Sequence, residues 1–119
     1  MLMFTTDHEW LDTSGDDVAV GITDHAASEL GDIVFIELPS VGDSFSKGDE
    51  VVAIDSTKAA SGITAAIDGV VTAVNDELVD APESVNADPM GTWFFRIDPT
   101  DPAQLDELLD EAAYRALIG

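Results

Sequence analysis

The chain has 119 residues, of which 45% are hydrophobic, so it is long enough for one modest core and too apolar for a disordered tail. Four Lys and Arg residues against 25 Asp and Glu residues give a formal net charge of −21, which repels phosphate backbones and argues against nucleic-acid binding. The lack of cysteine excludes disulfides, thiolate metal sites and a cysteine nucleophile. No signal peptide or membrane-spanning run is recognisable, so a cytoplasmic protein without membrane contact is expected.

The acidic residues are spread over the whole chain and not gathered in one tail. Three interpretations compete for this acidity: a docking surface for a basic partner, a cation-binding surface, and adaptation to a salty medium. In concentrated salt the self-repulsion of such a surface is screened. The dispersal of the acids and the scarcity of lysine favour the halophilic interpretation.

Short apolar runs, separated by turn residues, predict the elements of the first half of the chain. Strands are expected over residues 4–11, 18–22 and 32–38, with a helix over 24–30. Thr23 or Asp24 can cap this helix, and Gly31 fits the position after its end.

Residues 50–74 form a nearly symmetric segment centred on Lys58. Both flanks are rich in Val, Ile, Thr and Ala, and each ends in an Asp/Gly pair. Two such runs around a short polar connection predict a β-hairpin with the lysine at its tip. A lysine on an exposed turn is accessible to an acylating enzyme, although a solvated surface charge in an unmodified binding module is the simpler alternative.

The second half of the chain predicts a turn of helix over residues 82–86 and a strand over 93–97. Asp101, Pro102 and Gln104 match a capping box at the start of a helix. Asp110 can cap a second one, so helices are expected over about residues 102–118. Many short strands with terminal helices indicate one mostly β domain, a barrel or sandwich, over residues 1–119.

Catalytic and metal-binding motifs are weak. Residues 44–47 match the S-x-x-K motif of penicillin-binding enzymes, but its partner motifs are missing and the local pattern is strand and turn. An enzyme using Ser44 and Lys47 is therefore the last alternative. His8 and His25 stand in separate segments, so no ligand spacing can be argued and no metal site is predicted.

Beyond these local patterns, a series of short motifs stands in one order along nearly the whole chain, from about His8 to Ile118. They are His8-Glu9-Trp10, Gly21-Ile22-Thr23-Asp24-His25-Ala26, Leu30-Gly31-Asp32, Glu37-Leu38-Pro39, Asp55-Ser56-Thr57-Lys58-Ala59, Val85-Asn86, Asp88-Pro89 and Trp93. In these motifs the chain resembles the glycine cleavage system H protein family. The resemblance implies a barrel-sandwich hybrid, like a lipoyl domain, with short peripheral and C-terminal α-helices.

The same resemblance implies a non-catalytic carrier with (R)-lipoate in amide linkage to Lys58. Such a carrier takes the aminomethyl group of glycine from the P protein, a pyridoxal-phosphate decarboxylase, to the T protein, an aminomethyltransferase. It then presents the dithiol to the L protein, a dihydrolipoamide dehydrogenase. A lipoate-attaching enzyme is also implied as a partner, with Asp55, Ser56 and Ala59 as its recognition residues, and a monomer is expected.

The resemblance further implies a cleft in which the loaded arm docks. Glu9 is expected to meet the aminomethyl nitrogen there, with Asp7 and the backbone near Thr64 as further contacts. The chain departs from the family pattern around the lysine. Asp55 and Thr57 replace the usual Glu and Val, and Gly62 stands where an acid is common.

Two other carrier functions are compatible with an acylated lysine. An H-like lipoate-binding protein could serve another pathway, such as sulfur oxidation through heterodisulfide-reductase-like complexes. Biotin is less well supported, because Lys58 lacks the flanking methionines that usually accompany a biotinyl lysine.

Overall fold

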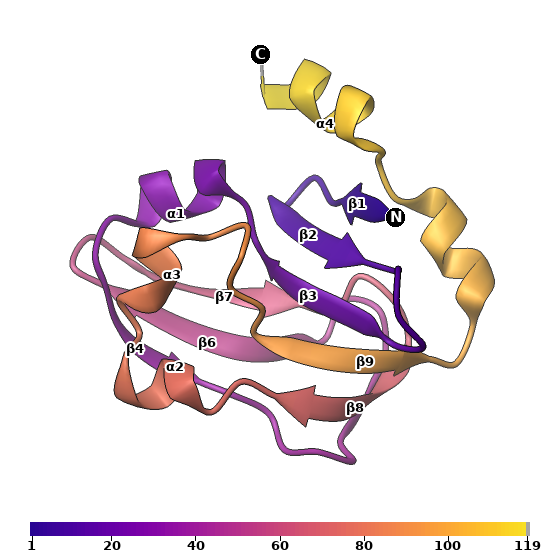
Figure 1. The fold of residues 1–119 in the computed structure, drawn as a ribbon, viewed down its shortest axis with the longest axis horizontal. Coiled ribbons are helices and arrows are strands. Elements are labelled where there is room, and N and C mark those ends of the chain that lie inside the picture. The colour runs from indigo at the N-terminus through magenta and orange to yellow at the C-terminus, as the bar shows by residue number, and fades with distance from the viewer. Residues whose placement is uncertain (119) are drawn as a thin grey trace.

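The computed structural model describes residues 1–118, which form two antiparallel β-sheets bordered by short helices (Figure 1). In spatial order, the larger sheet comprises β1 (Leu2–Phe4), β2 (Glu9–Asp12), β3 (Val18–Ile22), β9 (Phe95–Pro99), β8 (Gly69–Val74) and β5 (Ser44–Phe45). The smaller sheet comprises β4 (Ile33–Glu37), β6 (Glu50–Ser56) and β7 (Ala60–Thr64). The predicted mostly β class is confirmed, and the arrangement is that of a barrel-sandwich hybrid.

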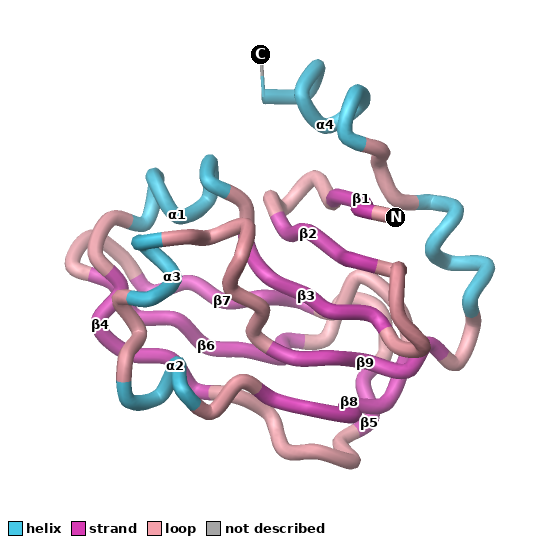
Figure 2. Tube along the Cα trace, in the orientation of Figure 1, coloured by secondary structure: helices cyan, strands magenta, loops and turns pink. Residues whose placement is uncertain are grey.

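The helices are all short and lie at the periphery of the strands (Figure 2). They are α1 (Asp24–Leu30), α2 (Glu77–Asp80), α3 (Ser84–Ala87), the 3-10 helix η1 (Pro102–Glu107) and α4 (Glu111–Ile118). Within residues 1–118, no helix has the length and apolar composition needed to cross a bilayer.

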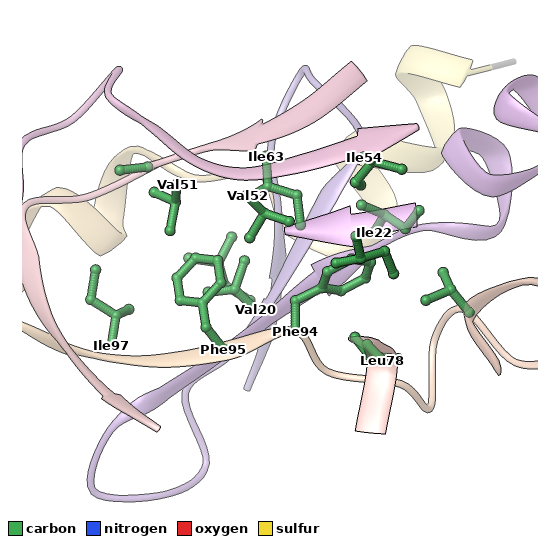
Figure 3. Packing of buried hydrophobic residues seen from close by; sticks show 14 of the residues in the cluster. Val20, Ile22, Val51, Val52, Ile54, Ile63, Leu78, Phe94, Phe95 and Ile97 are labelled. Atoms are coloured by element: carbon green, nitrogen blue, oxygen red, sulfur yellow. The ribbon is translucent and has the colours of Figure 1, made fainter. Parts of the chain in front are cut away.

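The core lies between the two sheets and is built from apolar side chains that alternate along their strands. Val52, Ile54 and Ile63 of the smaller sheet are at most 1% exposed. Figure 3 shows them facing Phe94 and Phe95, which are equally buried. Full burial stabilises each such side chain by roughly 1.5–3 kcal/mol, so this layer fixes how the two sheets are placed relative to each other.

Local signals within β3 and α1 are confirmed. β3 spans the predicted residues, and Thr23 caps α1 through its Oγ1, which accepts a hydrogen bond from the Ala26 N–H at 3.3 Å. Gly31 has a φ of 74° and a ψ of −152°, a positive-φ conformation that is readily open to glycine alone.

The single first strand predicted over residues 4–11 is wrong, because the chain turns back on itself there. The His8 N–H donates to the Thr5 carbonyl at 3.2 Å, and β1 pairs with β2 so that Phe4 faces Trp10. His8 itself adopts a φ of 67°, which the sequence does not signal because glycine is the usual residue in that conformation.

The lysine hairpin is shorter than predicted. Its second arm, β7, ends at Thr64, and the chain then crosses to the larger sheet, where β8 pairs with β5 and β9. Ala65 and Ile67 are buried in the crossing, so an apolar pattern continues through a segment that is not strand. The hairpin therefore covers residues 50–64 and not 50–74.

At the carboxyl end the predicted capping box does not form. Asp101 makes no side-chain capping bond, and Gln104 Oε1 accepts instead from the Asp68 N–H at 2.6 Å. The segment is a 3-10 helix and not the predicted α-helix. The second predicted cap is confirmed, since Asp110 Oδ1 accepts from the Ala113 N–H at 2.8 Å. The strand expected over 93–97 begins two residues later, and α2 was not predicted.

Candidate functional site

The turn between β6 and β7 presents Lys58 at an exposed position, as predicted. Ser56 organises this turn: its N–H donates to the Ala59 carbonyl at 2.9 Å, and its Oγ donates to the same oxygen at 2.9 Å. The N–H groups of Ala59 and Lys58 point back to Ser56 Oγ at 3.1 and 3.3 Å. These bonds hold the lysine on a defined backbone and not on a loose loop.

The turn is also tied to the end of α1, which lies beside it (Figure 1). The Thr57 N–H donates to the Asp32 carbonyl at 3.0 Å. A Cβ added to Gly31 would lie 3.2 Å from both Cδ and Cε of Lys58, so the lysine stem passes directly over this glycine. Gly31 thus serves twice, in ending the helix and in leaving space for the stem.

The residues predicted to mark the turn for an attaching enzyme surround the lysine. Asp55 is exposed at the end of β6, where it pairs with Ala60, and Ala59 is exposed in the turn. Ser56 is half-buried, since its hydroxyl is engaged with the backbone. The structure brings all three to the tip of the hairpin.

A groove of about 300 Å³ separates the hairpin from α1 and the start of β2. Its walls come from the start of β2, the end of β3, the helix α1 and both strands of the hairpin; the residues are Asp7, His8, Glu9, Ile22, Ala26, Glu29, Leu30, Ile54, Ala59, Ala60, Ser61 and Gly62. Ala59, the residue after Lys58, and Glu9 are both among the residues that line this groove. A second hollow of about 260 Å³ shares Asp7 and Glu9 and adds Thr64.

Glu9 is a buried acid, with only 3% of its surface exposed. Its Oε2 accepts from the Thr64 N–H at 3.0 Å, and its Oε1 accepts from the Thr5 hydroxyl at 3.3 Å. Burial raises the pKa of Glu9 from 4.5 to about 7; the Thr64 hydrogen bond opposes this rise, and the nearby Asp7 charge adds to it. The predicted trio of Asp7, Glu9 and Thr64 is thus brought together, with Thr64 contributing its backbone.

Gly62 is explained by the close pairing of β6 and β7. A Cβ at this position would lie 2.5 Å from the Val52 carbonyl oxygen, so no side chain fits without a shift of the backbone. The Glu50 carboxylate lies beside the same point, at 3.2 Å. This backbone therefore has no room for a side chain at Gly62, and the Glu50 carboxylate of the neighbouring strand lies next to it.

The S-x-x-K match has none of the geometry that the motif requires. Ser44 lies in the two-residue strand β5 and not at a helix start, and Lys47 forms an exposed ion pair with Glu107 at 3.2 Å.

Sequence reasoning missed the contact of two histidines, one of which, His8, lines the groove. The rings of His8 and His25 lie 4.4 Å apart between centroids, and His25 Nε2 lies 3.1 Å from Glu29 Oε1. The i, i+4 spacing of His25 and Glu29 on a predicted helix was a usable signal for their contact. The approach of His8 depends on the turn between β1 and β2, which the sequence did not predict.

Comparison with known proteins gives consistent results. The family model described as Glycine cleavage H-protein matches residues 2–119. A "Glycine cleavage system H protein 2" from Pseudomonas putida is 51% identical over 119 residues, covering 99% of this chain and 94% of that protein. A "Glycine cleavage system H protein" from Burkholderia vietnamiensis is 51% identical over 118 residues, covering 98% and 94%.

A solved structure agrees in fold as well as in sequence. The crystal structure of a glycine cleavage system H protein from Mycobacterium marinum matches with a TM-score of 0.89 and 36% identity, covering 99% of this chain and 96% of that one. Both the family model and the relatives extend over nearly the whole chain, with the lysine hairpin and the groove inside the matched region. The chain belongs to the glycine cleavage H-protein family.

Proposed function

We propose that this protein is the lipoyl carrier of a glycine cleavage system, with (R)-lipoate attached to Lys58. The attached group would supply a disulfide that takes the aminomethyl group from P protein, yields its carbon at T protein and is reoxidised by L protein. The observation that carries the proposal is Lys58 itself. It stands on a hydrogen-bonded, exposed turn in a chain that is 51% identical to named H proteins over almost its full length.

The residues around Lys58 suit such an attachment. The stem passes over Gly31, where a larger residue would obstruct it, and the adjoining groove offers the apolar side chains of Ile22, Leu30 and Ile54. An acyl chain attached at the turn can lie along this apolar wall or extend into solvent. A flexible arm on a fixed base reaches several partner sites at high effective concentration.

Glu9 would provide the polar end of the docking groove. Its buried carboxyl has a pKa near 7, so the approach of a cationic amine would favour the ionised form and create a charge-assisted contact. Thr64 and Thr5 hold the carboxyl oxygens in place during this change. Asp7, exposed at the edge of the groove, adds negative potential.

Intact mass and peptide mapping on protein from a host with active lipoylation test the proposal. One lipoyl group is expected on the peptide that contains Lys58, and none on a Lys58→Arg variant. Lys47→Arg is the matched control, because Lys47 is the other lysine and lies outside the turn. It should be modified as the parent is.

The same preparation then decides between pathways. Lipoylated protein should support glycine cleavage in a mixture of P, T and L proteins, and the Lys58→Arg variant should not. An unmodified Lys58 in a competent host would indicate a binding module. A modified protein that is inactive in this mixture would indicate a carrier for another pathway.

A further inference from the structure

We propose that His8, His25 and Glu29 form a binding site for a divalent transition-metal ion. His25 and Glu29 stand one turn apart on the same face of α1, while His8 reaches them from the turn between β1 and β2. Each of the three can offer one ligand atom, and these atoms all lie within 4.8 Å of one another. The inference concerns this cluster alone and does not depend on the modification of Lys58.

The donor set indicates which ions would bind. Two imidazoles and one carboxylate are a common three-residue set for zinc, whereas magnesium and calcium prefer oxygen ligands alone. Bonds of 2.0–2.1 Å in a tetrahedral site place ligand atoms about 3.3 Å apart. His25 Nε2 and Glu29 Oε1 already lie 3.1 Å apart, so only a modest adjustment of these side chains is required.

His8 is held in place by a buried chain of hydroxyl groups. Its Nδ1 lies 2.9 Å from Tyr114 Oη, which in turn lies 2.7 Å from Thr23 Oγ1. Tyr114 and Thr23 are 4% and 2% exposed, so their mutual contact is shielded from water, and the contact to the half-buried His8 is partly shielded. With Nδ1 engaged, Nε2 of His8 is the nitrogen left for an ion, and Tyr114 becomes the outer partner that histidine ligands of metals usually have.

The backbone supports the same orientation. His8 adopts a φ of 67°, which is unusual for a residue with a side chain, and its carbonyl accepts from the Thr23 N–H at 3.0 Å. The His8 ring lies beside the His25 ring of α1, with centroids 4.4 Å apart. Glu29 and His25 have side chains that are 65% and 36% exposed, so an ion and a fourth ligand from solvent can enter.

Zinc binding to purified, metal-free protein tests the proposal by calorimetry. The background for all variants is Lys58→Arg, because a dithiol on the arm would itself bind zinc. Excess magnesium chloride is included to occupy exposed carboxylates without competing for imidazole. One saturable zinc site is expected, and His25→Gln should weaken it about tenfold or more. Asp24→Asn is the matched control, since Asp24 is an exposed acid next to His25 that lies outside the cluster.

Tyr114→Phe tests the positioning of His8 separately. It keeps the ring that stacks on Phe4, with centroids 4.6 Å apart, and removes the hydroxyl next to His8 Nδ1. Zinc affinity should fall by about 10-fold or more, as for other outer partners of metal ligands. Unchanged affinity in this variant would overturn the role of Tyr114. The metal site itself would be overturned by the lack of a saturable site in the Lys58→Arg background, or by equal zinc affinity after His25→Gln.

Discussion

At the scale of single residues, Glu9 places an ionisable carboxyl in a buried setting, with only 3% of its surface exposed. The carboxyl is enclosed between β2 and the end of β7, and it receives hydrogen bonds from Thr5 and Thr64. Hydrogen bonds to the oxygens favour the ionised form, while desolvation favours the neutral form, and desolvation is the larger effect. Near neutral pH this carboxyl is therefore poised between the two states.

A Glu9→Gln variant should reveal this balance in the pH dependence of stability. The folded protein keeps the Glu9 proton up to pH about 7, whereas the unfolded chain releases it near 4.5. Glu9 thus makes the free energy of unfolding fall as pH rises through this window, by up to roughly 3 kcal/mol. Glutamine cannot ionise, so the free energy of unfolding of the Glu9→Gln variant should not fall in this way. The difference between variant and parent should therefore grow between pH 4.5 and about 7 and stay constant at higher pH.

Urea unfolding of the parent and the Glu9→Gln variant at a series of pH values from 4 to about 8 measures this difference. Glu37→Gln is the control, because Glu37 is exposed on β4 and its removal should leave the shape of the curve unchanged. Parallel curves for the parent and the Glu9 variant would contradict the prediction.

At the scale of secondary-structure elements, the close approach of β2 and β3 depends on Gly21. This residue pairs with Trp10, and a Cβ at Gly21 would lie 2.5 Å from two carbons of the indole ring. The ring cannot easily move, because it is 4% exposed and its Nε1 donates to the Pro89 carbonyl at 3.1 Å. One glycine thus allows a tryptophan to lie flat across the neighbouring strand.

A Gly21→Ala substitution should therefore lower the free energy of unfolding by about 1–3 kcal/mol, as overpacking does in other cores. Chemical denaturation measures the loss. Gly15→Ala is the matched control, since a methyl group there would lie 3.1 Å from the flexible end of the Arg96 side chain and at an ordinary 3.7 Å from the Asp17 carbonyl oxygen. Equal stability of the two variants would show that Trp10 can relocate at little cost.

Elements whose ends are set by neighbouring residues could be predicted from the sequence, and elements that depend on distant contacts could not. The cap at Thr23 and the glycine at Gly31 act within the helix that they delimit, so α1 was placed correctly. Gln104 fits a capping box by its spacing, yet it accepts from Asp68, 36 residues away, and no local rule contains that partner. The end of the hairpin at Thr64 was not predicted either, because buried apolar residues continue along the chain after the strand has ended.

In the candidate site, too, the part formed by neighbouring residues could be predicted and the parts formed by distant residues could not. The position of Lys58 at a turn followed from the symmetry of its flanks, which is a local pattern. The groove residues were indicated only by resemblance, because Glu9 and Thr64 are joined across 55 residues by the pairing of the sheets. The approach of His8 to His25 requires a left-handed residue in an unpredicted turn, and its sequence gives no sign of it.

At the scale of the whole molecule, the net charge of −21 dominates. Among residues 1–118 the ion pairs of lysine and arginine join Lys47 to Glu107, Arg96 to Asp17 and Arg115 to Glu111. Most of the 25 acidic residues must therefore repel one another across the surface. Self-repulsion of this kind opposes the compact state at low ionic strength.

The thermal midpoint should consequently rise by several degrees as KCl is increased to about 1 M, where the Debye length shrinks to about 3 Å. Thermal unfolding in a KCl series measures this. Tetramethylammonium chloride at equal ionic strength is the control, because screening does not depend on the identity of the cation. A midpoint that hardly changes with KCl would contradict salt adaptation and favour a basic docking partner.

The exposed ammonium group of Lys58 offers a way to separate acylated from unacylated protein molecules by charge. Lys58 takes part in none of the ion pairs among residues 1–118, so acylation would remove one positive charge without breaking any of them. In a chain with only four Lys and Arg residues, this is a quarter of its basic side chains. Carriers with and without the arm would then differ by one full charge and elute separately on an anion exchanger, where the ratio of two peaks would report how completely a cell has loaded them.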